Sequence, residues 1–592
     1  MKVALIGAEL EENLGLRYIA SSLERHEHEV EIIPFNSQHD IPRAVKHITG
    51  FKPQITGLSM VFTGRAKEFC QLAQTLRDEG YSGHIIAGGH FASFNCIQLL
   101  KDFPSFDSVG LGEGEELVCA LADNLDNVCQ IPGLCYRRGD GTLATNPSTG
   151  NPDNLDALPF PKRTEFHEYF DKPIASILSS RGCWRNCAFC SINAWYKRGG
   201  GRKFRLRSVE NIVAEMKELY FLHGVRIFNF QDDNFFLQNQ TQALRRFEEI
   251  RAGLRREGVE EIAIAIKARP DSITFDSIKV LDDLGLFRVF LGVENASENG
   301  LSNLNRKCTL EMILNALRIL NDFDIHVAYN ILMFEPDTVM SDILTNLRFI
   351  ERHIDNPFNF CRAEAYAGTG LEEKLLAEDR LLGDYFGFDY RLKDPKSEAF
   401  HQIANYAFFN RNFSDSGLHY FNMQVDFYFQ LLRRFNPEVL TQTLRGAVRS
   451  FIKQTNLDTY MHLCQIYDFV TTVNPDNQVT IRSFARDMRQ RVDERGRQLR
   501  AQGEHVQNQL GEAYKHPGQR IKATCAPIAG AGLQLLGGMA RPYHSSDSPK
   551  ELEFGVHALK SQAGTELLGI APAPMPYRVF REQLAKQKQE RR

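Results

Sequence analysis

Three cysteines in the spacing C-x3-C-x2-C restrict the fold of this chain more than any other feature; they are Cys183, Cys187 and Cys190. Thiolates at this spacing can bind three irons of a [4Fe–4S] cluster and leave the fourth iron open to a substrate. The alternative is a zinc knuckle whose fourth ligand lies elsewhere. A strand-like run at residues 174–179 precedes the triplet, and α/β barrels place active-site loops in this position. The sequence therefore predicts an α/β barrel with a metal cluster after its first strand.

The region after the triplet continues to alternate between strand-like and helical patterns. Helical periodicity is clear at residues 209–221 and 310–322. Candidate strands lie at residues 174–179, 225–230, 261–268, 287–293, 326–333 and 359–365. Six βα units predict a partial (β/α)6 barrel over residues 171–370, with its chemistry at the carboxyl ends of the strands.

The first 130 residues show a second α/β pattern. Candidate strands, separated by amphipathic stretches, lie at residues 2–7, 28–35, 54–60, 84–89 and 106–112. They predict a domain over residues 1–130 with a parallel, doubly wound sheet, flavodoxin-like or Rossmann-like. No G-x-G-x-x-G follows the first strand, which disfavours a dinucleotide. The polar and glycine-rich strand ends indicate a ligand, and the alternative is a cofactor-free domain whose glycines only make turns.

The other two segments differ in composition. Residues 131–157 are rich in Gly, Asn, Asp and Pro, which predicts a linker with a small hairpin over residues 131–170. Residues 371–592 predict a mainly helical domain that covers the barrel mouth, and its aromatic residues favour core packing over a substrate pocket. Within it we predict a solvated helix or helix pair and then a loop, at residues 479–513 and 526–538.

Composition excludes two classes of partner. The net charge is only −4 over 592 residues, with both signs mixed, so no charged surface for nucleic acid or an acidic membrane is predicted. No uncharged apolar run approaches the length of a membrane span, and the first residues do not fit a signal peptide. The cysteines outside the triplet have no disulfide-like spacing. We therefore expect a cytoplasmic protein with reduced cysteines.

The triplet resembles the signature of the radical S-adenosylmethionine enzymes, in which an aromatic residue precedes the third cysteine; here this residue is Phe189. Ahead of it, short motifs follow the order and spacing of the cobalamin-binding domain in cobalamin-dependent radical S-adenosylmethionine enzymes. These motifs are Glu12-Asn13-Leu14-Gly15, Ser59, Gly88-Gly89-His90 and Gly112-Glu113-Gly114-Glu115. The chain is similar to this family over about residues 1–370, and the resemblance does not reach the last third.

The resemblance implies three cofactors: a [4Fe–4S] cluster on the cysteine triplet, S-adenosylmethionine and cobalamin. The aminoacyl group of S-adenosylmethionine needs a carboxylate near its ammonium and a cation near its carboxylate. By resemblance, Asp232 or Asp233 holds the ammonium, Arg269 and Glu294 hold the carboxylate and ribose, and Phe189 lies beside the cofactors. The Gln-Asp-Asp stretch departs from the Gly-Gly-Glu form found elsewhere in the superfamily, which leaves open which aspartate points inward. Polar residues at strand ends also cap helices, so capping remains the alternative for each.

For cobalamin the resemblance implies contacts from the loops after several strands. The expected residues are Asn13, Leu14, Ser59, Val61, Phe62, Arg65, Gly88, Gly89, His90, Gly112, Glu113 and Gly114. Many cobalamin domains supply a cobalt-ligating histidine from the loop after the first strand, but residues 7–15 contain none. We therefore predict base-off cobalamin with no protein imidazole on cobalt and residues 59–65 beneath the ring. Arg65 either reaches the ring or starts a helix facing solvent.

The resemblance implies a cobalamin-dependent radical enzyme, most often a methyltransferase acting on an unactivated carbon of a metabolite or peptide. One alternative is another outcome on the same cofactors, such as cyclisation, ring rearrangement or non-radical methylation. A second is a sensor or electron carrier without turnover. The expected partners are the substrate and a reductant such as flavodoxin or ferredoxin, and neither nucleic acid nor a membrane is expected.

Overall fold

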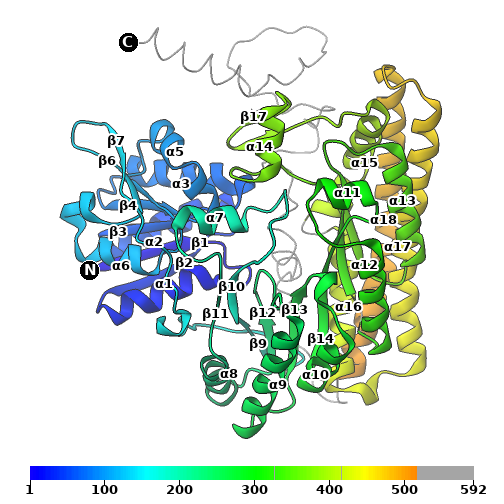
Figure 1. The fold of residues 1–592 in the computed structure, drawn as a ribbon, viewed down its shortest axis with the longest axis horizontal. Coiled ribbons are helices and arrows are strands. Elements are labelled where there is room, and N and C mark those ends of the chain that lie inside the picture. Colours follow the sequence, from blue (N-terminus) through cyan, green and yellow to red (C-terminus); the bar gives the residue numbers. More distant parts are fainter. Residues whose placement is uncertain (326, 415–416, 516–592) are drawn as a thin grey trace.

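The computed structural model describes residues 1–325, 327–414 and 417–515 (Figure 1). The predicted loop at residues 526–538 lies outside the described residues. Two seven-stranded sheets are followed along the chain by a group of long helices. In Figure 1 the first sheet, in blue and cyan, lies beside the second, in green, and the long helices flank the second sheet on its other side.

Five parallel strands form most of the first sheet. They are β1 (Lys2–Gly7), β2 (Glu29–Pro34), β3 (Ile55–Ser59), β4 (His84–Gly88) and β5 (Ser108–Gly110), connected through α1 (Leu14–Arg25), α2 (Ile41–Phe51), α3 (Ala66–Asp78), α4 (His90–Phe94) and α5 (Cys96–Asp102), with α6 (Glu115–Asp123) following β5. Their order is β2-β1-β3-β4-β5, which is the order of flavodoxin-like folds. The predicted doubly wound domain is therefore confirmed, with its ligand-binding edge at the carboxyl ends of the strands.

The hairpin expected in the linker extends this sheet. Its strands are β6 (Leu134–Arg137) and β7 (Leu143–Thr145), and β6 pairs antiparallel with β5 through the register Val109 to Cys135. Both of these side chains are fully buried, so packing on the sheet core holds the hairpin in place. The domain boundaries of the sequence analysis stay a prediction.

The second sheet is a curled, open barrel of six parallel strands with one antiparallel edge strand. Its order is β16-β15-β14-β13-β12-β9-β8, so the two edges do not pair and the barrel is partial, as predicted. The parallel strands are β9 (Lys172–Ile177), β12 (Ile227–Phe230), β13 (Ala263–Ala268), β14 (Leu286–Glu294), β15 (Val327–Phe334) and β16 (Phe358–Arg362), and β8 (His167–Tyr169) is the edge strand. The helices between the strands are α8 (Val209–His223), α9 (Gln240–Arg256), α10 (Phe275–Leu284), α12 (Leu310–Asp322) and α13 (Met340–Arg352).

Four long helices complete the described part of the chain: α15 (Pro395–Phe413), α16 (Leu418–Phe435), α17 (Gln442–Thr472) and α18 (Gln478–Tyr514). Phe427 and Leu431 of α16 pack on Ala263 and Phe287, near the starts of their strands. Helix α16 therefore lies against the strand starts, at the end opposite the cysteine triplet, and the predicted cover of the barrel mouth by residues 371–592 stays a prediction. Alternating apolar residues at the strand starts need this cover.

Helix α18 corrects a prediction. The charged segment at residues 479–513 forms one continuous helix, and it is not fully solvated. Its buried residues recur every three or four positions and face α15, α16 and α17: Ile481, Ala485, Met488, Val492, Leu499, Gly503, Val506 and Leu510. The apolar residues of α18 are few and are separated in the sequence by arginines and glutamines, which is why the sequence analysis missed its buried face.

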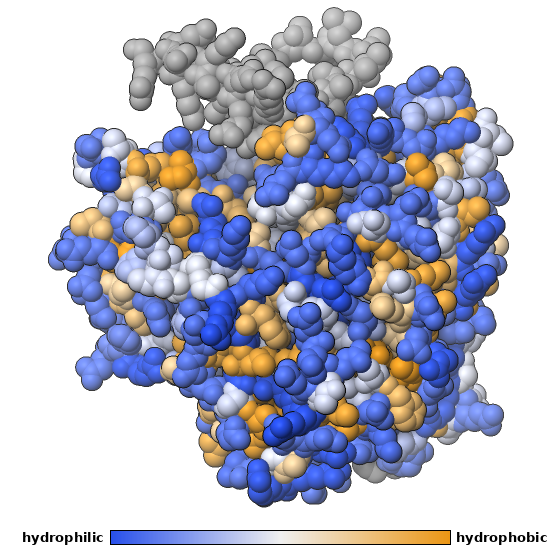
Figure 2. Space-filling view, in the orientation of Figure 1, coloured by the Kyte–Doolittle hydropathy of each residue, from blue (hydrophilic) through white to orange (hydrophobic). Residues whose placement is uncertain are grey.

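The surface agrees with the composition. The face drawn in Figure 2 is mainly hydrophilic, with small hydrophobic patches between. Among the described residues, none of the helices is both long and apolar enough to cross a membrane.

Candidate active site

The cysteine loop begins with a glycine that no other residue can replace. Gly182 ends β10 (Ser180–Gly182), which pairs with β11 (Phe204–Leu206), and has φ +85°. A Cβ on Gly182 would lie 1.8 Å from the carbonyl oxygen of Lys203. The loop is held further along by the Ala188 N–H, which donates to Leu304 at 2.9 Å, and by the Ala188 carbonyl, which accepts from Leu371 at 2.8 Å. Backbone bonds thus fix the loop before any cofactor binds.

The three sulfurs lie within electrostatic range of one another. Burial raises the pKa of the Cys183 thiol to about 11 and raises the pKa of Cys190 further, with the neighbouring cysteines adding to both. Cys187 is the one with cationic partners, because Arg269 donates Nη1–H to its Sγ at 3.4 Å and Arg306 does so at 3.2 Å. Two guanidinium donors suit a thiolate, so the triplet fits a cluster whose iron offsets the burial of the other sulfurs.

Within the described residues, no three His, Cys, Asp or Glu side chains converge as ligands of one ion. A [4Fe–4S] cluster does not require three side chains to converge on one ion, because each of its cysteines binds a separate iron.

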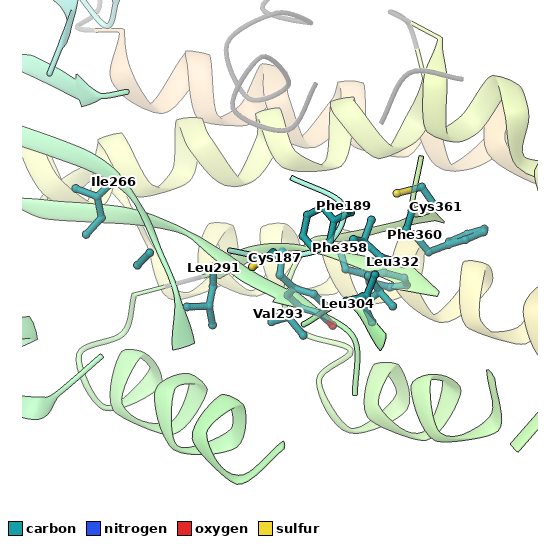
Figure 3. Packing of buried hydrophobic residues seen from close by; sticks show 14 of the residues in the cluster. Cys187, Phe189, Ile266, Leu291, Val293, Leu304, Leu332, Phe358, Phe360 and Cys361 are labelled. Carbon is teal, nitrogen blue, oxygen red and sulfur yellow. The ribbon is translucent and has the colours of Figure 1, made fainter. Parts of the chain in front are cut away.

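Phe189 lies in the barrel core behind the cysteine loop. Its ring is buried and belongs to the same hydrophobic cluster as Phe358, Phe360 and Leu332 (Figure 3). The aromatic residue of the motif thus anchors the loop to the last strands of the barrel, and its predicted role beside the cofactors stays a prediction.

The two aspartates after β12 have different environments. Asp232 is fully buried and accepts from the backbone N–H of Ser179 at 3.0 Å, from the Ser179 hydroxyl at 2.6 Å and from the Ser180 hydroxyl at 2.6 Å. Asp233 is half-buried, and its Oδ2 accepts from the Gly182 N–H at 3.0 Å. Burial raises the pKa of both carboxyls; nearby Lys267 opposes this. Asp232 thus braces the cysteine loop, and Asp233 keeps an oxygen free for a ligand.

Arg269 lies beside Cys187 and Glu294 lies close to the two arginines, but Arg269 is heavily engaged. Besides Cys187 it donates to Asp271 at 2.9 Å and to the Arg306 carbonyl at 2.6 Å. Glu294 is buried with φ +62°; burial raises its pKa, and the two arginines oppose this. Sequence analysis missed Arg306, which lies in the short loop after α11 (Glu298–Asn303) and carries no motif to reveal it.

The carboxyl ends of β3 and β4 form an open, glycine-lined edge. Gly89 has φ +97°, and a Cβ there would lie 3.0 Å from the Met60 backbone, whereas a Cβ on Gly88 would meet nothing within 4 Å. The expected contact residues Ser59, Val61 and Phe62 are half-buried at this edge. A flat ligand can therefore approach the backbone closely, which fits a corrin.

His90 faces the barrel domain. Its ring stacks on Trp195 of α7 (Ile192–Gly199), the helix that follows the cysteine triplet, with ring centroids 4.4 Å apart. The His90 Nε2 is buried without a partner among the described residues, and burial lowers the pKa of the imidazole to about 4. The loop after β4 and the helix after the triplet thus contact each other directly.

Several residues expected to contact cobalamin have other partners. Arg65 is buried at the start of α3 and donates to the Phe35 carbonyl at 2.9 Å and to Glu68 at 2.8 Å, so it does not face solvent. Asn13 accepts from the Leu16 N–H at 3.2 Å and caps α1, whose first residue, Leu14, is buried. Their cobalamin roles stay predictions.

The motif after β5 joins the two α/β units. Glu113 is buried in ion pairs with Arg205 at 2.5 Å and Arg181 at 3.1 Å. A Cβ on Gly112 would lie 2.7 Å from the Cα of Gly199, and one on Gly114 would lie 2.7 Å from Ile19. Gly112 and Glu113 therefore act at the contact between the two units, whereas Gly114 packs on α1 within the first domain.

The loop after β1 also reaches the barrel, through Glu11 and Glu12. Glu12 accepts from the Ser176 N–H at 2.5 Å and from Arg163 at 2.8 Å. Glu11 accepts through Oε2 from the Gln231 side chain at 3.3 Å, and its Oε1 is buried without a partner among the described residues. Sequence analysis named Glu12 only as part of a cobalamin-domain motif and did not single out Glu11, although a run of acids in this loop was the available signal.

Comparison with known proteins agrees with both halves of this site. A model of the radical SAM superfamily matches residues 177–350, and a model of the B12 binding domain matches residues 6–122. The uncharacterized methyltransferase PH0819 of Pyrococcus horikoshii is 26% identical over 381 residues, which cover 62% of this chain and 79% of that protein. The chain is a cobalamin-dependent radical S-adenosylmethionine enzyme. Its cofactors are therefore a [4Fe–4S] cluster, S-adenosylmethionine and cobalamin, which decides against the zinc knuckle, the cofactor-free domain and the sensor.

Two further relatives are informative for this radical enzyme. Hopanoid C-3 methylase of Methylococcus capsulatus is 29% identical over 337 residues, which cover 55% of this chain and 61% of the methylase, less than two thirds of its length. The structure of the cobalamin-dependent radical enzyme OxsB with aqua-cobalamin bound has a TM-score of 0.62 at 17% identity and covers 91% of this chain and 84% of OxsB. The similarity to OxsB is a similarity of fold. Because it covers 91% of this chain, it extends into the helical last third.

We expect cobalamin in this radical enzyme to bind without a protein nitrogen on cobalt. The loop after β1 contains no histidine, and the nearby His90 ring is stacked on Trp195. Electron paramagnetic resonance of the bound Co(II) form checks this, and no nitrogen superhyperfine splitting from the protein is expected. A splitting that disappears in His90→Ala would show histidine ligation and refute the prediction.

A second expectation concerns Glu11. Burial raises the pKa of this carboxyl well above its usual range, Glu12 adds to the shift and Lys267 opposes it. A raised folded-state pKa contributes stability at low pH that is lost as the pH rises through that pKa. Glu11→Gln copies the neutral form, so at pH 8 we expect its Tm to exceed that of the wild type by about 2–4 °C, with the difference vanishing near pH 4. Thermal unfolding at both pH values checks this, and a lower Tm for Glu11→Gln at pH 8 would contradict it.

Proposed function

We propose that this enzyme transfers a methyl group from S-adenosylmethionine to an unactivated carbon of a small molecule. The observation that carries the proposal is the contact between the two cofactor-binding edges. Besides the His90 stack, Trp195 donates to the Ser93 hydroxyl at 3.3 Å, and Arg198 donates to the Ser93 carbonyl at 2.6 Å. A carbon held between these edges is reachable from both cofactors, which the transfer requires.

The chain's own residues bind and orient the reactants. The cofactors supply a carbon-centred radical and a methyl donor. Asp233, whose second oxygen accepts nothing from the described residues, would accept from the ammonium of S-adenosylmethionine, and Asp232 would hold the cysteine loop through Ser179 and Ser180. The sealed strand starts under α16 exclude water from the lower barrel, which protects a radical from side reactions.

Several proteins similar to this chain are named as methyltransferases, which supports methyl transfer. Besides PH0819 and the hopanoid methylase, cytidylyl-2-hydroxyethylphosphonate methyltransferase of Streptomyces wedmorensis is 26% identical over 377 residues. A second candidate is cyclisation, because the anaerobic magnesium-protoporphyrin IX monomethyl ester cyclase of Synechocystis is 25% identical over 344 residues. We further propose a flavodoxin-like or ferredoxin-like reductant and a cytoplasmic location, since the described cysteines are free thiols that suit a reducing compartment.

The test follows the methyl group. Protein reconstituted anaerobically with iron, sulfide and cobalamin is incubated with reductant, trideuteromethyl-labelled S-adenosylmethionine and extract from cells that lack an active copy. We expect a trideuteromethyl product in the mass spectrum, together with S-adenosylhomocysteine and 5′-deoxyadenosine, and none with Cys187→Ala. Deoxyadenosine with an unmethylated product would replace the proposal by cyclisation, and no product of either kind would overturn it.

A further inference from the structure

Two buried arginines converge on one cysteine sulfur. The Nη1 atoms of Arg269 and Arg306 lie 3.4 Å and 3.2 Å from the Sγ of Cys187, and no guanidinium N–H among the described residues bonds to Cys183 or Cys190. The arrangement is asymmetric, because one ligand of the triplet carries both positive neighbours. Hydrogen bonds from charged donors are roughly twice as strong as those between neutral groups.

The two arginines differ in what else they hold. Arg269 is neutralised by Asp271 at 2.9 Å. Arg306 donates to the Gly292 carbonyl at 2.5 Å, and its Nε is buried without a partner among the described residues. Among the described residues Arg306 forms no ion pair, and burial raises the pKa of Glu294, an acid within electrostatic range of it. Asp271 therefore compensates much of the positive charge of Arg269. The positive charge of Arg306 has no such partner among the described residues and acts mainly on the Cys187 sulfur.

The loop that carries Arg306 is fastened to the cysteine loop. Asn305 donates to the Asn186 carbonyl at 2.6 Å, and the Leu304 carbonyl accepts from Ala188. Asn305 and Lys307, on either side of Arg306, both have φ near +50°, at 51° and 52°. Two left-handed residues around one arginine cost free energy and persist only where the surroundings hold them. The backbone on both sides of Arg306 therefore fixes its direction toward Cys187.

We propose that Arg306 sets the reduction potential of the cluster by donating its N–H to the Cys187 sulfur. When one electron from an external donor enters the oxidised [4Fe–4S]2+ cluster to give the 1+ state, the site gains one negative charge, and no bond breaks and no proton moves. A buried positive donor stabilises the added charge more than it stabilises the oxidised state. Arg306 is a positioning residue that makes the cluster easier to reduce. The proposal rests on cluster binding and not on methyl transfer.

The experiment is a redox titration of reconstituted protein without S-adenosylmethionine, followed by electron paramagnetic resonance of the reduced cluster. Arg306→Gln removes the charge, and we expect about a tenfold lower ratio of reduced to oxidised cluster at a fixed potential, a midpoint about 59 mV more negative. Lys307→Gln is the matched control, because it removes an exposed charge from the next position; we expect a change under about twofold, worth less than about 20 mV.

Iron content is measured alongside, so that cluster loss is distinguished from a changed potential. Arg306→Gln with four irons and an unchanged midpoint would overturn the proposal, as would an equal shift in Lys307→Gln. If Arg306→Gln does not retain the cluster, Arg306→Lys decides, because it keeps the charge and loses the geometry of the guanidinium. A two- to fivefold lower ratio is then expected, and an unchanged midpoint would refute the role.

Discussion

Replacing Cys187 with alanine is expected to lower the iron content of anaerobically reconstituted protein from about four irons per chain to below about one, and to abolish 5′-deoxyadenosine formation. Each cysteine of the triplet holds a different iron, so the loss of one leaves two protein ligands for the whole cluster. Cys187 is the most informative of the three, because Arg269 and Arg306 would then be left as two buried cations facing an empty space. Iron and sulfide assays, visible absorption and product chromatography check the result.

The matched control is Cys308→Ala. Cys308 is buried within electrostatic range of Arg306 and Cys187, yet it lies outside the triplet. We expect this variant to keep about four irons and its visible absorption. If it loses the cluster as completely as Cys187→Ala, a fourth cysteine closes the iron that S-adenosylmethionine needs, and the assignment of three ligands is wrong.

The second prediction with a large expected effect distinguishes the roles of Asp232 and Asp233. Asp233→Asn should weaken S-adenosylmethionine binding by about 1.5–3 kcal/mol, the usual worth of a hydrogen bond to a charged group. The reason is that one oxygen of Asp233 accepts from Gly182 while the other accepts nothing from the described residues. Isothermal titration of the cluster-loaded protein measures the affinity, and thermal unfolding should show little change.

Asp232→Asn is the matched variant with the opposite expectation. An amide at this position would present donors to the hydroxyls of Ser179 and Ser180, which already donate to Asp232. A buried donor without an acceptor costs about 1–3 kcal/mol, so stability should fall more than affinity. If Asp232→Asn loses affinity at unchanged Tm while Asp233→Asn binds normally, the assignment is reversed.

Much of the fold could be predicted because it depends on local patterns. Strand-like runs of four to eight residues and the helices between them are set by periodicity, and each predicted barrel strand has a counterpart from β9 to β16. The cysteine triplet was equally accessible, since its ligands lie within eight positions and the chemistry requires that spacing. The prediction failed where a helix was judged alone, because the buried stripe of α18 depends on partners elsewhere in the chain.

By itself, therefore, the sequence determined the two α/β units and the cofactor class, because each rests on residues close together in the chain; the cluster ligands are a prediction from the same local pattern. Only the tertiary structure decided what the single side chains do. Arg306 meets Cys187 across 119 positions, and Glu11 meets Gln231 across 220. The choice between Asp232 and Asp233 turns on hydrogen bonds from the preceding strand, and Arg65 is bound by the carbonyl of Phe35. No periodicity encodes such contacts, because they arise only when buried polar groups from distant segments must satisfy one another.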